Sequence, residues 1–275
     1  MSCSASSLAA SESLTGTATS GTRWLLVEVR GTWGRDVVAD SGLSDEIRAT
    51  LAGFPGKVLF VRRPDSKDGV FVCAVTASES GGSARSQRLD RLADLPDADF
   101  EAGEPVAGPI VLVCAHGRRD ACCATLGVPL YAALDGLLPP RRLWQSSHLG
   151  GHRFAPNLLV LPHGVQLGRI PIDRAAEVTE LLAAGRIPLD LYRGRTIYEP
   201  PVQAAELAVR QETRCDAIAD LRLLAHVGGT VSFATPGGEL EVRVEELPGP
   251  LVPVSCGADP EPTRAWVTSL AGALQ

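Results

Sequence analysis

Two pairs of potential metal ligands in the middle of the chain constrain its fold more than any other feature of the sequence. Cys114 and Cys123 are separated by eight residues, and His148 and His152 are separated by three. Thiolate sulfur and neutral imidazole nitrogen are both good ligands for transition metals. A fold that brings both pairs to one place would therefore create a site with two sulfur and two nitrogen donors.

The residues around the cysteines suit a ligand role. Cys114 lies near the end of the apolar stretch PIVLVCA (109–115), which predicts a strand, and Cys123 precedes a predicted helix over about 126–138 that ends at a proline pair. The N-terminus of a helix and nearby arginines, here Arg118 and Arg119, both favour thiolate over thiol.

The histidine pair lies in the segment SSHLGGHRF. In a helix, residues four apart share one face, but Gly150 and Gly151 make a tight loop the better prediction, because glycine accepts the backbone angles that such a bend needs. In either conformation, both imidazoles can reach one metal.

Two chemical interpretations of this donor set stay open at the level of the residues. A structural zinc ion fits the spacing of the histidines, but zinc cysteines are usually separated by about two to four residues. A 2Fe-2S cluster bound by two cysteines and two histidines, the Rieske type of ligand set, fits the wider cysteine spacing, because the cluster itself separates its ligands.

The other cysteines and histidines offer competing assignments. Cys122 competes with Cys123 as the ligand, and the two could instead form a redox-active dithiol, although neighbouring cysteines form a strained bond. We expect His116 to donate a hydrogen bond to a ligand sulfur. The isolated cysteines are expected to be small buried apolar residues: Cys3, Cys73, Cys215 and Cys256.

Composition narrows the function classes. A net charge of −6 and a pI near 5.4 argue against nucleic-acid binding, which requires a field of basic residues. No apolar stretch reaches the roughly 20 residues needed to span a bilayer, and the polar first 20 residues do not resemble a signal peptide. We therefore expect a cytoplasmic protein with no membrane partner.

Hydrophobic patterning predicts an α/β protein with three parts. Residues 1–105 are expected to form a small α/β domain, and 106–200 a central domain with the order β-α-β-β-β-α. Residues 201–275 are expected to form a small α+β extension, with a helix to about His226, a hairpin around Pro236–Gly238 and a final helix near Ala265. The second half of the polar stretch 78–108 is predicted to hold the main boundary, and 191–201 to be a linker or arm. Arg153, Arg193 and Arg195 are expected on a solvated face, with a partner-docking surface as the alternative.

The segments CAHGRRDACCA and WQSSHLGGHRFAPNLLVLPHGVQLGRI resemble the sucrase/ferredoxin-like family of thioredoxin-like ferredoxins. The resemblance is strong over about 106–200 and weak after about 202. It implies a thioredoxin-like ferredoxin domain, a role in electron transfer, and a 2Fe-2S cluster. Matched position by position, the cluster ligands are Cys114, Cys123, His148 and His152.

The resulting hypothesis is a one-electron carrier rather than a catalyst, which exchanges electrons with donor and acceptor proteins that the sequence does not identify. Neutral imidazoles in place of two thiolates should raise the reduction potential, and their outer nitrogens should make it depend on pH. The alternatives are a zinc-stabilised interaction module and a thiol-redox enzyme on a thioredoxin-like scaffold, with Cys122 or Cys123 as nucleophile. The oligomeric state is left open.

Overall fold

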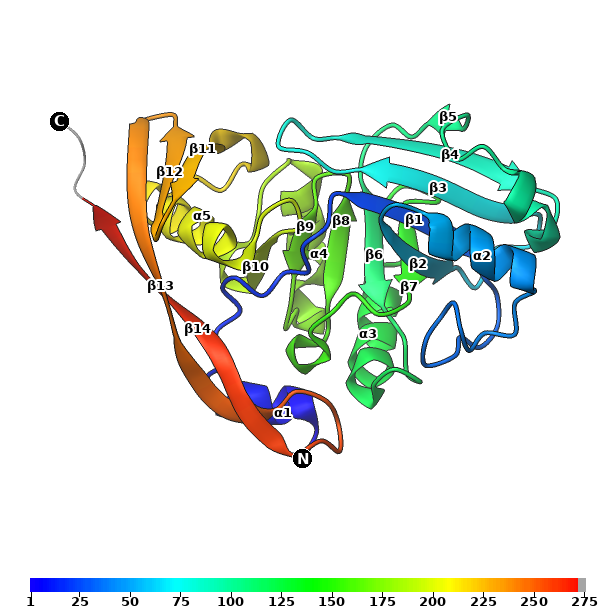
Figure 1. The fold of residues 1–275 in the computed structure, drawn as a ribbon, viewed down its shortest axis with the longest axis horizontal. Helices are drawn as coiled ribbons and strands as arrows, with labels where there is room; N and C mark the ends of the chain where they lie inside the picture. Colours follow the sequence, from blue (N-terminus) through cyan, green and yellow to red (C-terminus); the bar gives the residue numbers. More distant parts are fainter. Residues whose placement is uncertain (272–275) are drawn as a thin grey trace.

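A computed structural model of the protein describes residues 1–271, which form a large mixed sheet flanked by helices and a smaller second sheet beside it (Figure 1). The helices are α1 (Cys3–Ala9), α2 (Asp45–Gly53), α3 (Ala121–Leu134), α4 (Ala175–Ala183) and α5 (Pro200–Thr213). The strands of the large sheet are β1 (Arg23–Glu28), β2 (Lys57–Arg62), β3 (Val70–Thr76), β4 (Ser83–Leu89), β5 (Glu104–Pro105), β6 (Ile110–Cys114), β7 (Leu143–Ser146), β8 (Leu158–Leu161), β9 (Val165–Leu167) and β10 (Tyr192–Arg195). The strands of the small sheet are β11 (Arg222–Val227), β12 (Thr230–Thr235), β13 (Gly238–Pro253) and β14 (Pro260–Ala271).

The large sheet contains the same connection twice. Its strand order is β10-β9-β8-β6-β7-β2-β1-β3-β4-β5. In the first half, α2 connects β1 to its parallel neighbour β2, and the other neighbour of β1 is the antiparallel strand β3, which pairs with β4. In the second half, α3 connects β6 to its parallel neighbour β7, and the other neighbour of β6 is the antiparallel strand β8, which pairs with β9. The two halves meet where β2 and β7 pair antiparallel. The sheet therefore continues across residues from both 1–105 and 106–200.

Alternating side chains of the strands fill separate core clusters. Leu25 and Val27 of β1 pack with Ile47 and Leu51 of α2. Leu26, one residue out of phase, belongs to a cluster that continues into β6, β7 and β8. This alternation is the strand period of two, and it explains why central strands of a sheet covered on both faces are apolar almost throughout.

The predicted order of elements in the central region is confirmed, with shifted boundaries. The order β-α-β-β-β-α corresponds to β6, α3, β7, β8, β9 and α4. Helix α3 begins earlier than predicted because the Asp120 side chain accepts a hydrogen bond from the Cys122 N–H group and so caps the helix. The hairpin expected around Pro236–Gly238 is also present, between β12 and β13.

Three local predictions are wrong. The predicted linker 191–201 contains β10. The polar stretch 78–108 contains β4 in its first half, which pairs with β3 over its whole length, while the boundary predicted in its second half stays a prediction. The helix expected to reach His226 ends at Thr213, and the helix expected near Ala265 is strand β14. In each case hydrogen bonds to a neighbouring strand decide the conformation, and such partners are not visible in local patterning.

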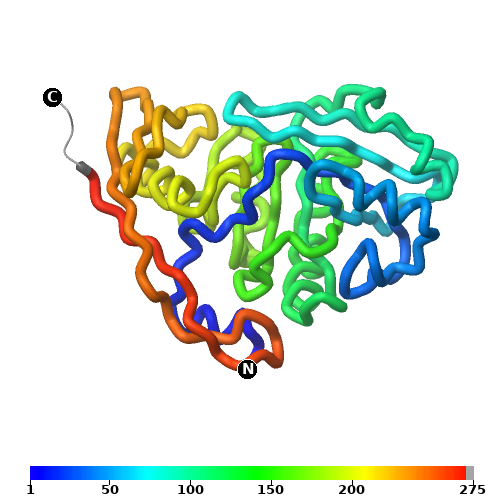
Figure 2. The backbone as a smooth tube through the Cα atoms, viewed as in Figure 1, coloured from blue at the N-terminus to red at the C-terminus, as the bar shows by residue number. Residues whose placement is uncertain are grey.

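A long two-stranded arm leaves the small sheet. β13 and β14 pair from Glu241 with Ala271 to Pro253 with Pro260, and the far end of this hairpin lies beside α1 at the N-terminus (Figures 1 and 2). The turn of this hairpin and the N-terminal helix α1 thereby meet near the start of α3. Among residues 1–271, no helix is long and apolar enough to cross a membrane.

Candidate metal centre

Three of the four predicted ligands converge at the tip of β6. The Sγ atoms of Cys114 and Cys123 and a ring nitrogen of His148 all lie within 4.8 Å of one another. Cys114 ends β6, Cys123 lies in the first turn of α3, and His148 lies just beyond the end of β7. Because β6 and β7 are parallel neighbours, their ends reach the same edge of the sheet and bring these side chains together.

The fourth predicted ligand, His152, lies next to His148. The two imidazole ring centroids are 5.0 Å apart. The chain between them bends through Gly150 and Gly151, whose φ angles of 84° and 65° are in the left-handed region that favours glycine. A Cβ atom on Gly151 would lie 2.4 Å from Nη2 of Arg193, so this loop has no space for a larger residue.

Neither ring nitrogen of His152 has a hydrogen-bond partner among residues 1–271, although both are buried. The backbone of Val254 approaches the ring without hydrogen-bond geometry, and Oδ2 of Asp120 is 3.6 Å from Nε2. Burial lowers the pKa of His152, which keeps the ring neutral. A buried, neutral imidazole without partners is the form that binds a metal.

Hydrogen bonding between the two cysteines shifts their pKa values in opposite directions. Hydrogen bonds from Cys123, from His148 and from the Leu149 N–H group hold the pKa of Cys114 well below its usual range, even though burial opposes this. The Cys123 pKa is raised, chiefly because its thiol donates to Cys114 and because it is buried. The pair therefore behaves as one thiolate and one thiol, and a bound cation would favour deprotonation of both.

The donor set therefore fits a thiophilic transition metal or a small iron-sulfur cluster. It contains two sulfurs at a buried edge and two imidazoles, and neither ring nitrogen of His152 has a hydrogen-bond partner among residues 1–271. Of the two adjacent cysteines, only Cys123, which was the predicted ligand, lies close to Cys114 and His148.

The surroundings differ from the sequence prediction at several positions. His116 is buried, but its Nε2 atom is paired with the Gly34 carbonyl oxygen at 2.7 Å rather than with a sulfur. Arg193 and Arg195, expected on a solvated face, have 1% and 0% of their surface exposed. Arg193 donates hydrogen bonds to the Gly150 carbonyl oxygen and to Oδ1 of Asn157, and the first of these contacts stabilises the loop between the two histidines.

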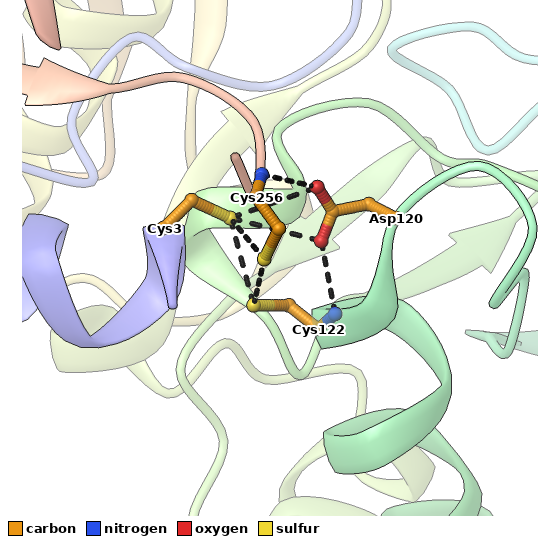
Figure 3. Close-up of side chains that lie close together, drawn as sticks. All are labelled: Cys3, Asp120, Cys122 and Cys256. Atoms are coloured by element: carbon orange, nitrogen blue, oxygen red, sulfur yellow. Dashed lines mark hydrogen bonds between the residues drawn. The ribbon is translucent and has the colours of Figure 1, made fainter. Parts of the chain in front are cut away.

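A second sulfur cluster was missed entirely. Cys3 and Cys256, expected to be isolated, lie against Cys122 and Asp120 (Figure 3). Their separation in the chain left no spacing pattern to detect. The one available signal was the Cys122–Cys123 pair, since adjacent residues of a helix cannot both point at one site.

The fold and the site together define an α/β protein with a buried cysteine–histidine centre suited to a transition metal. The chain belongs to the Sucrase/ferredoxin-like family, which matches residues 14–194 and so includes all four predicted ligands.

Among curated relatives, three fungal proteins share the name "Altered inheritance of mitochondria protein 32". The Meyerozyma guilliermondii protein is 29% identical over 119 residues, which is 39% of this chain and 42% of the relative. The Saccharomyces cerevisiae protein is 29% identical over 128 residues, which is 42% of this chain and 41% of the relative. The Kluyveromyces lactis protein is 43% identical over 56 residues, or 20% of this chain and 17% of the relative. The chain thus matches less than half the length of these relatives, and no solved structure matches it.

Proposed function

We propose that this protein is a one-electron carrier that holds a 2Fe-2S cluster on Cys114, Cys123, His148 and His152. The observation that supports it most is the convergence of these side chains at one sheet edge, together with the unpartnered buried nitrogens of His152. Membership of a family described as ferredoxin-like agrees with the cluster. When bound, such a group supplies a one-electron couple, at roughly −150 to +300 mV for the Rieske ligand type.

We further propose that the half of the sheet that holds the site is a thioredoxin-like domain. Its strand order β7-β6-β8-β9 has one parallel pair joined by a helix, followed by two antiparallel pairings and a closing helix, α4. In this arrangement the tip of β6 and the start of α3 form the edge of the sheet at which the proposed ligands gather. The domain boundaries at 105/106 and 200/201 stay predictions.

The burial of the four proposed ligands indicates which side of the site a redox partner would approach. The cysteines lie on the inner side, with 1% of each exposed, while both histidines are half-buried. The histidine edge is therefore the side from which a partner protein would exchange electrons. Arg193 holds the histidine loop in place through the Gly150 carbonyl oxygen.

Metal and sulfide analysis tests the proposal. The full chain, purified without oxygen, should contain two irons and two sulfides per chain, show visible charge-transfer bands, and give a rhombic electron paramagnetic resonance signal on reduction. Cys114→Ala should lose all of these, whereas the matched control Cys215→Ala, at a partly buried cysteine just beyond α5, should keep them. A colourless wild-type protein without iron would exclude the cluster.

Histidine ligation gives a second test. The outer nitrogen of an iron-bound imidazole gains proton affinity on reduction, so the potential should fall as pH rises. Voltammetry between about pH 6 and 10 measures this dependence. A flat potential would exclude solvent-accessible histidine ligands.

A zinc-stabilised module is the second candidate for the same residues. Cys123 Sγ and His148 Nδ1 are 3.7 Å apart, a separation that two ligands of one tetrahedral ion also have. Stoichiometric zinc bound to two sulfurs and two nitrogens, with no iron, would favour it. A thiol enzyme is less well supported, because Cys122 and Cys123 are both buried and a nucleophile must be accessible.

The cellular setting is part of the proposal. We keep the cytoplasm as the predicted location, and protein donors and acceptors as the predicted partners. The names of the fungal relatives refer to mitochondria, so fractionation of cells that express the tagged full chain would test the location.

A further inference from the structure

A second group of metal-binding side chains lies beside the first and uses none of its residues. It consists of the thiols of Cys3, Cys122 and Cys256 and the carboxylate of Asp120 (Figure 3). Cys3 begins α1, Cys122 lies in the first turn of α3, and Cys256 lies in the loop between β13 and β14. Three segments far apart in the chain thus meet at one point.

The three sulfurs form a nearly equilateral triangle. The Sγ–Sγ distances are 3.5 Å from Cys3 to Cys122, 3.3 Å from Cys122 to Cys256 and 3.5 Å from Cys256 to Cys3. A disulfide would join two of them at about 2.05 Å and leave the third unused, so it does not explain a symmetrical arrangement. Equal separations are what ligands around one common centre have.

The distances fit a single tetrahedral ion. Zn–S bonds of about 2.3 Å that diverge at the tetrahedral angle place two sulfurs about 3.8 Å apart, and a sulfur and a carboxylate oxygen about 3.5 Å apart. The two oxygens of Asp120 lie 3.7 and 3.9 Å from Cys3 Sγ.

Asp120 is held in position as a ligating carboxylate should be. Its Oδ1 atom accepts from the Cys122 N–H group at 2.9 Å, and Oδ2 accepts from the Cys256 N–H group at 2.7 Å and the Ser255 hydroxyl at 3.0 Å. Carboxylates that bind metals are commonly fixed by such hydrogen bonds, and an ionised carboxylate has lone pairs left for the metal.

The position of this group also gives it a structural role. The apolar contacts there are few: Cys3, Cys122 and Ala155 are buried, with Leu126 and Cys256 partly buried against them. Such a small cluster supplies little hydrophobic stabilisation for the end of a long hairpin and a seven-residue helix, α1. A metal ion bound at this point would attach both to α3.

From this geometry we infer that Cys3, Cys122, Cys256 and Asp120 bind one Zn²⁺ ion, separate from the proposed cluster, which clamps the N-terminal helix and the β13–β14 hairpin onto α3. Three thiolates and one carboxylate at tetrahedral spacing are a donor set that zinc prefers. The inference does not depend on which metal group the first centre holds.

X-ray absorption at the zinc edge tests the site without any variant. The full chain, purified anaerobically with reductant and one added equivalent of Zn²⁺, then desalted, should show three sulfur neighbours at about 2.3 Å and one oxygen at about 2.0 Å. Two sulfurs and two nitrogens would place the zinc in the first centre and overturn the inference. Failure to retain zinc would also overturn it, as would a Cys122–Cys256 disulfide in anaerobically alkylated protein.

Paired variants separate the two centres. Cys256→Ser should lose one zinc per chain and keep the metal content of the first centre, whereas Cys123→Ser should lose the metal of the first centre and keep this zinc. Cys215→Ser is the control for removal of a partly buried cysteine elsewhere. Zinc content unchanged in Cys256→Ser would contradict the inference.

Hydrogen exchange tests the clamp. Removal of zinc by a chelator should increase exchange in residues 1–12 and 250–262 and leave α2 unchanged. If both segments are equally protected from exchange with and without zinc, the clamping role is excluded. The X-ray absorption data would then test zinc binding independently of that role.

Discussion

Cys122 and Cys123 are neighbours in the first turn of α3, but their sulfur atoms belong to different clusters. Cys122 Sγ lies 3.3 Å from Cys256 Sγ, and Cys123 Sγ lies 3.7 Å from Nδ1 of His148. Consecutive residues of a helix point about 100° apart, so one helix start can contribute a ligand to each of two centres.

The first prediction concerns this division. Cys123→Ser should abolish the visible absorption of the proposed cluster, because it removes one of four ligands, whereas Cys122→Ser should retain it. Iron content and the absorption spectrum of the anaerobically purified variants measure the difference. A Cys122→Ser protein that is colourless but folded by circular dichroism would reverse the ligand assignment.

Arg193 should stabilise the histidine loop. Its guanidinium is buried and donates to Oγ1 of Thr17, to the Gly150 carbonyl oxygen and to Oδ1 of Asn157, contacts that a lysine ammonium cannot make together. We expect Arg193→Lys to cost about 2–4 kcal/mol of unfolding free energy in urea titration. The control Arg186→Lys, in a largely exposed ion pair, should change it by less than about 1 kcal/mol. Equal effects would show that the buried contacts contribute no special stability.

Gly127 allows α3 to pack closely on β6. A Cβ atom at this position would lie 1.9 Å from the Cys114 carbonyl oxygen, so Gly127→Ala must displace the helix that holds Cys123. We expect a loss of about 2–4 kcal/mol in unfolding free energy and weaker retention of iron. Gly53→Ala in α2, where a Cβ would meet nothing within 4 Å, is the matched control and should be neutral or slightly stabilising. An iron content in Gly127→Ala equal to that of the control would contradict this role.

His163 should make stability depend on pH. Burial and the nearby Arg195 lower its pKa in the folded protein, so the unfolded chain binds a proton more readily. The contribution of His163 to the free energy of unfolding is therefore complete above the unfolded-state pKa of about 6.5. It decreases as the pH falls from that value toward the lower pKa of the folded state. Urea titrations at several pH values should show a shallower loss in His163→Asn than in the wild type. The exposed His226→Asn serves as control; identical profiles for wild type and His163→Asn would refute the prediction.

Local sequence patterns were sufficient to predict a structural element where the interactions that form it are local or repeat along that element. The strand that ends at Cys114 and the glycine bend between the histidines follow from residues within a few positions of one another, whereas the helix α3 was predicted to begin about five residues too late. The family resemblance added the prediction of the four ligands, and the family match over 14–194 confirms the family itself.

Predictions failed where partners come from distant parts of the chain. β4, β10 and β14 are strands because neighbouring strands supply their hydrogen bonds, not because their side chains favour extended backbone. Arg193 and Arg195 are buried because carbonyl and amide oxygens from other segments surround them. A charged side chain enters a core only when such partners exist, and the sequence does not reveal them.

The sequence by itself determined the α/β pattern of the central region, because strand and helix periods are properties of contiguous residues, and with the family resemblance it predicted the four side chains of the first centre. Only the tertiary structure decided that Cys3 and Cys256 meet Cys122 and Asp120. That meeting depends on how a 16-residue strand, β13, directs a loop back to the N-terminus. Contacts between residues 253 positions apart arise from packing of the whole chain, and no local pattern encodes them.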